Sequence, residues 1–127
     1  MLRKIAVIAA LALTAAPLHA AEASLEGEWA RGDGKARVRI APCGGDLCAI
    51  NTWIRPGVAD EKVGDRLVMT IKAGGKADGA DAWSGKAYDP QRHMTFRMTI
   101  DVAATTMTTH GCVLGGLVCK TMGWTRL

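Results

Sequence analysis

The four cysteines are the residues of this chain whose type and spacing point most directly to chemistry. Cys43 and Cys48 enclose the stretch GGDL, and Cys112 and Cys119 enclose VLGGLV. A glycine-rich turn brings the two ends of such a stretch together, which suits a disulfide. Four cysteines allow three connectivities. Of these we expect the pairing Cys43–Cys48 and Cys112–Cys119.

A four-cysteine zinc site is the competing use of these residues. The paired ligands of such sites usually enclose about two to four residues, whereas the second pair here encloses the six residues VLGGLV. Neither pair has the Cys-x-x-Cys spacing of thioredoxin-like redox sites. We therefore expect structural disulfides, no metal and no other cofactor.

Catalytic groups are scarce in the sequence. Beyond residue 20 the only histidines are His93 and His110. Thr106 and Thr108 share a strand face with His110, and Asp101 lies upstream, but threonine-rich strand faces are common solvated surface. No Ser/His/Asp arrangement, phosphate-binding loop, calcium loop or haem-attachment motif is present. The sequence therefore predicts a protein that is not an enzyme. The alternative is a hydrolase whose catalytic groups are distant in sequence and meet only in the folded protein.

The first two dozen residues have the pattern of a secretory signal peptide. Arg3 and Lys4 precede an apolar run from Ile5 to Ala16, which Pro17 and small residues follow. The run is about a dozen residues long, and a helix needs roughly 20 to cross a bilayer. A retained membrane anchor helix or amphipathic helix is the alternative.

Cleavage is expected after Ala20, with Ala23 as a second position. The expected organisation is a signal peptide over residues 1–20 and a single β-barrel domain over residues 21–127, with no integral membrane segment after cleavage. The protein is then exported to the periplasm or beyond the cell, where the oxidising conditions favour disulfides.

The charge of the exported part is nearly balanced. Two of the sixteen Lys and Arg residues lie in the leader, so fourteen remain against twelve Asp and Glu. These basic residues are scattered, with no run and no patch interleaved with aromatic residues. The sequence therefore predicts no nucleic-acid partner.

The remaining sequence has the two-residue period of β-strands. The clearest example is HMTFRMTID, where Met94, Phe96, Met98 and Ile100 alternate with polar residues. The stretch from Ala36 to Ile54 is typical of a hairpin with a cysteine on each side of its turn. We count eight strands and expect a mobile loop over Ala73 to Ala82. This pattern predicts an all-β fold, a small antiparallel up-and-down barrel of about eight strands, with a two-sheet sandwich as the alternative.

Five short motifs, spread over nearly all of the chain after residue 26, resemble those of a known family. They are Gly27-Glu28-Trp29, ARVRIAPCGGDLC from Ala36 to Cys48, WSGKAYDP from Trp83 to Pro90, GCVLGGLVC from Gly111 to Cys119, and Trp124-Thr125-Arg126. The family is that of exported bacterial proteins known as domain of unknown function 2147. The resemblance implies a lipocalin-like (calycin-type) barrel, exported, with no established activity.

The sequence departs from the family pattern in two places. The segment from Arg55 to Lys72 lacks the Asn-Pro and Arg-x-x-x-Gly signals that many members carry in a longer loop, and Ala49 stands where many have Gly. The resemblance also implies a structural role for Gly27, Trp29 and Arg126. In calycin-type barrels the Gly-x-Trp motif packs at the closed end, under an arginine of the last strand.

Two functions from different classes follow from the barrel. The first is a binding module that takes a small apolar or amphipathic ligand, because methionine is adaptable and recurs on the two strands with the cleanest apolar alternation. A packed core would show the same pattern. The ligand-binding residues predicted on this basis are Leu67, Met69, Ile71, Met94, Phe96 and Met98.

The alternative is a cell-envelope interaction or structural protein that acts through its outer surface, for example through Thr95, Arg97 and Thr99. The sequence identifies no protein partner for it. The barrel then serves as a scaffold, and the interior is filled by the protein's own side chains.

The disulfide pairing is open to a direct test. Peptide mapping of the purified protein without reduction should recover Cys43 linked to Cys48 and Cys112 linked to Cys119. Each small loop should contribute roughly 2 kcal/mol to stability by chain entropy. A peptide that joins Cys43 to Cys112 or Cys119, or alkylation of all four cysteines in the native protein, would contradict the pairing.

Overall fold

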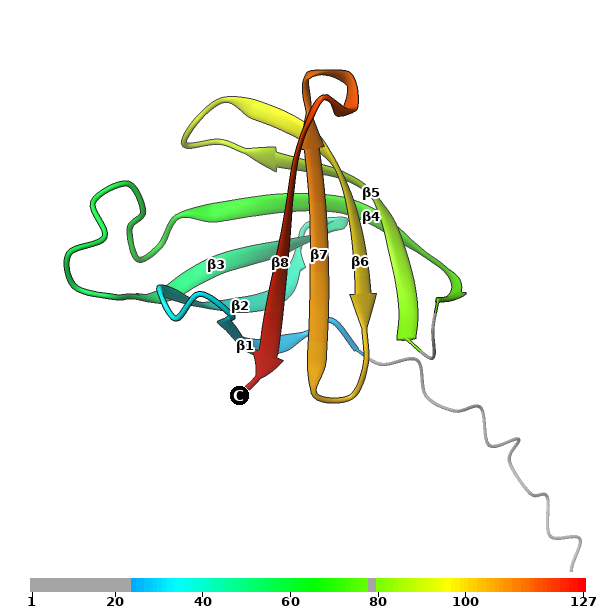
Figure 1. Cartoon of the computed structure of the whole chain (residues 1–127), viewed down its shortest axis with the longest axis horizontal. Coiled ribbons are helices and arrows are strands. Elements are labelled where there is room, and N and C mark those ends of the chain that lie inside the picture. The colour runs from blue at the N-terminus through cyan, green and yellow to red at the C-terminus, as the bar shows by residue number, and fades with distance from the viewer. Residues whose placement is uncertain (1–23, 78–79) are drawn as a thin grey trace, which may run out of the picture.

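The computed structural model describes residues 24–77 and 80–127 and shows eight strands and one short 3-10 helix, η1 (Figure 1). The expected signal peptide and both expected cleavage positions lie outside the described residues. The strands are β1 (Gly27–Arg31), β2 (Ala36–Cys43), β3 (Asp46–Ile54), β4 (Arg66–Ala77), β5 (Ala80–Asp89), β6 (Met94–Val102), β7 (Thr106–Val113) and β8 (Val118–Arg126), and η1 spans Leu114–Gly116.

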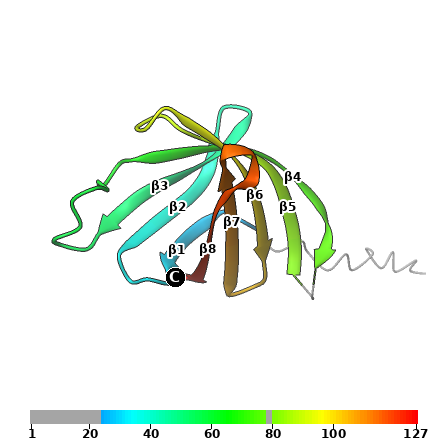
Figure 2. The same cartoon turned by 45° about the horizontal axis from the view of Figure 1, so that its top comes forward.

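The strands form one closed antiparallel barrel. Each strand pairs with the next along the chain, and β8 pairs with β1 through Trp29 opposite Arg126 and Arg31 opposite Trp124. The turned view of Figure 2 shows the strands side by side around the barrel. Every strand therefore has a paired neighbour on both sides. The prediction of an eight-stranded up-and-down barrel is confirmed.

The barrel interior follows from the alternation in the sequence. On β6, Met98, Ile100 and Val102 are buried while Arg97 and Thr99 are exposed, because successive side chains of a strand point to opposite faces. The largest fully buried side chains are those of Trp29, Leu25, Met69, Ile100 and Val102. Among the described residues, no helix is long and apolar enough to cross a bilayer.

The expectation of a mobile loop over Ala73 to Ala82 is wrong. β4 continues to Ala77 and β5 begins at Ala80, so most of this stretch belongs to a β-hairpin. The register between the two strands shifts between Ala73 and Lys76. A bulge of this kind accommodates glycines in a ladder whose hydrogen bonds come from the backbone and need no particular side chain.

The two ends of the barrel differ. The connections β1–β2, β3–β4, β5–β6 and β7–β8 lie at one end, which we call the mouth. Residues 24–26, the β2–β3 and β6–β7 connections, the adjoining ends of β4 and β5, and the C-terminus lie at the other, the closed end. In Figure 1 the β7–β8 connection stands at the top of the view and the C-terminus at the bottom.

The closed end is sealed by Trp29 and Arg126. The indole of Trp29 is fully buried and donates a hydrogen bond from Nε1 to the carbonyl oxygen of Leu25 at 3.0 Å. The guanidinium carbon of Arg126 lies 4.2 Å from the centre of the indole ring. Gly27 makes room for this arginine, because a Cβ there would lie 2.9 Å from its Nη1.

Arg126 also binds the segment that precedes β1 and the β6–β7 turn. Its guanidinium donates hydrogen bonds to the carbonyl oxygens of Ser24, Glu26 and Ala104. Three segments that are remote in sequence thus meet at one side chain. The arrangement matches the structural role that the family resemblance implies for Gly27, Trp29 and Arg126.

A disulfide lies at each end of the barrel. Cys43–Cys48 joins β2 to β3 at the closed end, with Cα atoms 5.7 Å apart, and Cys112–Cys119 joins β7 to β8 at the mouth, with Cα atoms 4.1 Å apart. Each disulfide crosses between neighbouring strands next to a turn. Among the described residues no cysteine is free.

The contact of Trp29 with Arg126 predicts coupled effects on stability. Trp29→Ala should lower the free energy of unfolding by about 3–5 kcal/mol, because the buried indole leaves a cavity. A double-mutant cycle with Arg126→Ala, followed by urea unfolding, should give an interaction energy of about 1 kcal/mol. Arg39→Ala, on the exposed face of β2, is the control, and its effect on the free energy of unfolding should simply add to that of Trp29→Ala. Simple additivity of Trp29→Ala and Arg126→Ala would contradict the stacking.

Candidate functional site

The mouth opens into a pocket inside the barrel. Its volume is about 310 Å³, and it lies between β6, β7, β8 and the start of β4. The wall is largely apolar, which is the property that ligand pockets for small organic molecules share. The apolar side chains that line it include Leu67, Met94, Phe96, Met98, Met122 and Trp124.

The width of this pocket depends on a small residue. Gly111 points into the barrel from β7, and a Cβ at this position would lie 3.1 Å from the ring of Phe96. The glycine therefore leaves space for the Phe96 ring beside it. Met94 is 41% exposed at the rim. A flexible methionine at an entrance can adapt to more than one ligand.

A second, deeper cavity of about 210 Å³ lies beside the first. Both cavities are lined by Leu67, Met98 and Trp124, so they adjoin. The indole Nε1 of Trp124 donates a hydrogen bond to Oγ1 of Thr109 at 2.9 Å. This bond satisfies the polar atom of the Trp124 ring, which leaves its apolar face free to form the wall. The apolar floor of the deeper cavity includes Val38, Ile40, Met69, Ile100 and Met107.

An ion pair holds the β3–β4 connection against the mouth. Arg31 of β1 donates two hydrogen bonds of 2.6 Å to the carboxylate of Glu61 and a further bond to Asp33. The Arg31 side chain is only 12% exposed. The bond from Arg31 lowers the pKa of Glu61, and the bond to Glu61 raises the pKa of Arg31. A paired, two-bond geometry of this kind fixes the loop more firmly than a single contact would.

The other side of the same connection is tied to the β5–β6 turn. Arg92 donates a hydrogen bond to the carbonyl oxygen of Asp60 at 2.6 Å, and Gln91 exchanges two hydrogen bonds with the backbone of Arg66. Burial alone would raise the pKa of Asp89, but hydrogen bonds from Arg92 and Gln91 outweigh it and keep that pKa below its ordinary value. The mouth is thus braced on two sides.

Lys120 differs from these paired charges. It lines the pocket from β8 and is exposed at the rim. Within the described part of the chain, no carboxylate forms an ion pair with it. Lys120 interacts electrostatically with Glu61, but the Glu61 carboxylate already accepts two hydrogen bonds from Arg31. Lys120 therefore presents a positive charge to whatever enters the pocket.

The predicted ligand-binding residues do not form a single site. Leu67, Met94, Phe96 and Met98 line the mouth pocket. Met69 is only 2% exposed and belongs to the core and to the floor of the deeper cavity.

Ile71 lies apart from the mouth pocket, in a separate hollow of about 670 Å³ toward the closed end, which is also lined by Leu47 and Trp83. Ile71 on β4 is nevertheless connected to Lys120 on β8 by register pairs between neighbouring strands. The row runs through Gly85, Met98 and Gly111. Because barrel strands tilt, such a row runs from one end of the barrel toward the other.

Sequence reasoning did not identify Arg31, Glu61, Lys120, Met122 or Trp124 as site residues. Arg31 and Glu61 are thirty positions apart, and no local pattern connects them. The last two could have been found, because Met122 and Trp124 alternate with polar residues on β8 as Met94 and Phe96 do on β6.

The threonine and histidine cluster lies on the outside of the barrel. Asp101 is opposite Thr108 across β6 and β7, and Nδ1 of His110 lies 2.6 Å from Oγ1 of Thr121. Within the residues described, no hydrogen bond or ion pair joins a histidine to a carboxylate. The arrangement shows no acid–base pair of the kind that activates a nucleophile.

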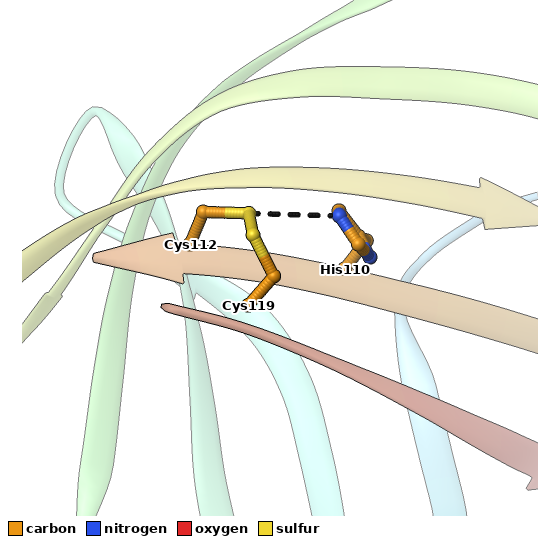
Figure 3. A group of neighbouring side chains, drawn as sticks. All are labelled: His110, Cys112 and Cys119. Atoms are coloured by element: carbon orange, nitrogen blue, oxygen red, sulfur yellow. Dashed lines mark hydrogen bonds between the residues drawn. A yellow bond between two sulfur atoms is a disulfide. The ribbon is translucent and has the colours of Figure 1, made fainter. Parts of the chain in front are cut away.

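His110 also lies beside a disulfide (Figure 3). Its Nε2 is 3.5 Å from Sγ of Cys112, and Sγ of Cys119 is bonded to that same sulfur. The three side chains are close enough to share a metal ion, but sulfur binds metals as thiolate. With the disulfide closed, this group lacks two of its three ligands.

The Arg31–Glu61 pair predicts a specific loss of stability in acid. Because the folded-state pKa of Glu61 lies below its ordinary value of 4.5, the pair contributes stability above that value and loses it as pH falls through the folded-state pKa. When urea unfolding is measured from about pH 6 down to about pH 3, the free energy of unfolding should therefore fall less in Glu61→Gln than in the parent. Glu61→Gln should also cost about 1 kcal/mol near neutral pH.

The control is Glu28→Gln, which removes the exposed contact of Glu28 with Arg39 at 3.3 Å. Exposed pairs contribute little, so this variant should follow the parent at every pH. Equal acid sensitivity of Glu61→Gln and the parent would show that the pair does not stabilise the mouth.

Comparison with known proteins identifies the family. A family model described as an uncharacterized protein conserved in bacteria (DUF2147) matches residues 27–126. The match runs from the first residue of β1 to the last residue of β8 and so includes every strand of the barrel. No curated protein and no solved structure matches the chain significantly. The chain belongs to the bacterial family of domain of unknown function 2147.

Proposed function

We propose that the protein is a non-catalytic binding module that holds one small apolar or amphipathic molecule in the mouth pocket. The observation that carries the proposal is the apolar pocket inside the barrel, which opens at the mouth and adjoins a second cavity that has an apolar floor and a polar, charged rim. Eight-stranded barrels are wide enough either to be filled by side chains or to hold one small ligand. The open volume in this barrel favours the binding of one small ligand.

The size and lining of the pocket indicate the kind of ligand. A volume of about 310 Å³ is at the lower end of the range for small-molecule sites, roughly 300–1,000 Å³. Apolar walls suit a short hydrocarbon chain or a single ring system. Lys120 at the rim would attract an acidic head group, since Glu61 is already paired with Arg31.

We also propose that the protein acts after export, in the periplasm or outside the cell. The N-terminal sequence has the signal-peptide pattern, and the barrel holds two disulfides. Disulfides persist in oxidising compartments and are rare in the cytosol. The pre-organised mouth, braced by ion pairs and a disulfide, needs little ordering before a ligand enters.

A bulky side chain inside the pocket should block binding. Met98 lines both cavities, so in Met98→Trp the indole should occupy ligand space and weaken a neutral apolar fluorophore such as N-phenyl-1-naphthylamine by about tenfold or more. If the pocket is open, the free energy of unfolding should change by less than the roughly 1–3 kcal/mol that overpacking of a filled core costs. Thr99→Trp, which places the same side chain on the outside of β6, is the matched control.

The role of Lys120 is tested with a charged ligand. In Lys120→Gln, dodecanoate should displace the fluorophore about two- to fivefold less effectively, which is the effect of losing one exposed charge pair. The affinity for the neutral fluorophore itself should not change. The proposal fails if the parent binds no apolar probe, or if Met98→Trp binds it as well as the parent does.

A further inference from the structure

The mouth carries an unusual share of exposed apolar side chains. Among the described residues, seven of the nine large hydrophobic residues that are exposed lie at this end of the barrel: Trp53, Val63, Tyr88, Met94, Leu114, Leu117 and Val118. The most concentrated are Leu114 and Leu117 of the β7–β8 connection and Val118 at the start of β8, which also lines the mouth pocket. Leu117 is 87% exposed, Leu114 71% and Val118 54%. Apolar residues gathered at one exposed place usually mark an interaction site.

We call residues 114–118 the tip. Figure 1 shows the β7–β8 connection, which forms most of the tip, at the top of the view. The disulfide Cys112–Cys119 crosses the hairpin directly below the tip. Leu114 has a φ of 54°, a left-handed conformation that costs energy for a bulky residue. A strained leucine that gains no burial in the barrel points to a role outside it.

Positive charges flank the tip on one side. Lys86 and Arg97 are directly opposite each other on β5 and β6 and both point outward. They share a surface hollow with Leu114 to Gly116. Two like charges directly opposite on a sheet repel each other, and in the part of the chain that the structure describes no carboxylate pairs with either. An anion between them would relieve this repulsion.

Lys120 lies on β8, next to the tip on its inner side. The acidic residues of the mouth lie elsewhere, on the β1–β2 and β3–β4 connections and at the end of β5. Arg31 binds Asp33 and Glu61, and Arg92 binds Asp89. Asp60 and Asp65 are likewise on the β3–β4 connection. Lys86, Arg97 and Lys120 therefore place positive charge on two sides of the tip, and among the described residues no ion pair includes them.

We propose that the mouth docks on the surface of an anionic phospholipid bilayer. Leu114, Leu117 and Val118 enter the boundary between head groups and acyl chains, while Lys86, Arg97 and Lys120 face the lipid phosphates. Apolar insertion and cationic attraction are each weak alone and bind a membrane effectively together. The disulfide holds the tip in place, so docking orders no flexible loop.

The shape of the tip favours a bilayer over a protein partner or a second copy of the chain. A stable protein interface needs about 800 Å² on each side, or roughly 20–30 residues. The tip is a five-residue protrusion with cations beside it. Docking stands independently of the proposed ligand, although it would point the mouth pocket toward the lipid.

Vesicle co-sedimentation tests the proposal. Leader-free protein, purified from the export compartment with disulfides intact and verified by intact mass, is mixed with phosphatidylcholine vesicles or with vesicles containing about 30% phosphatidylglycerol. The parent should bind the anionic vesicles at least tenfold more tightly at low salt, and high salt should remove most of the difference. The double variant Leu114→Asn/Leu117→Asn should lose about tenfold or more on both kinds of vesicle.

The charge variant separates the two contributions. Lys86→Gln/Arg97→Gln should weaken binding to anionic vesicles by about fivefold for each cation removed and leave the weak binding to neutral vesicles unchanged. The controls are Leu127→Asn, a 58% exposed leucine at the closed end, and Arg39→Gln, a 57% exposed arginine side chain on β2. Both should bind as the parent does. All substituted side chains are exposed, and circular dichroism should confirm that each variant folds.

Three outcomes would overturn the docking proposal. They are no sedimentation with either vesicle, parental binding by the tip variant, and a dimer in solution that the tip variant abolishes, which would assign the tip to self-association. Fluorophore binding, measured on the same variants without vesicles, reports the pocket separately. Loss of docking with an intact pocket, or the reverse, then shows which proposal has failed.

Discussion

The stacking of Arg126 on Trp29 is the interaction on which the rest of the barrel depends. A single guanidinium covers the buried indole and binds carbonyl oxygens in the N-terminal segment and the β6–β7 turn. The same two residues are register partners where β8 meets β1. The contact adds a side-chain link to the backbone pairing of β8 with β1 and covers the indole at the closed end. Gly27 is needed here because any side chain would collide with the guanidinium.

The interior holds open volume at both ends of the barrel. Leu25, Trp29 and Val102 are almost fully buried near the closed end, and a hollow of about 670 Å³ remains beside Leu25. Toward the mouth the wall includes Gly111 and flexible methionines around the pocket of about 310 Å³. One cluster of buried side chains, which includes Val38, Ile40, Met69, Met98 and Ile100, connects the two ends, so burial of apolar area along the whole interior stabilises the fold.

The mouth keeps its shape by polar and covalent contacts rather than by packing. Arg31 binds Glu61, Arg92 binds the backbone at Asp60, and a disulfide crosses the β7–β8 hairpin. Among the described residues, Lys86, Arg97 and Lys120 take part in none of these ion pairs and lie beside exposed leucines. The docking proposal arises from this combination of unpaired cations and exposed apolar side chains, whereas the ligand proposal arises from the apolar pocket.

The eight strands, their up-and-down order and the family could be predicted from the sequence, because alternation, turn residues and short motifs are local properties of the chain. The prediction failed between Ala73 and Ala82, where backbone pairing and a bulge outweigh weak side-chain propensity. Which apolar residues meet at the mouth could not be predicted in this way. Strand tilt separates Ile71 from Met94 and brings Met122 and Trp124 beside Met98, and closure brings Arg31 to Glu61. Such contacts depend on the geometry of the whole barrel, which no local pattern encodes.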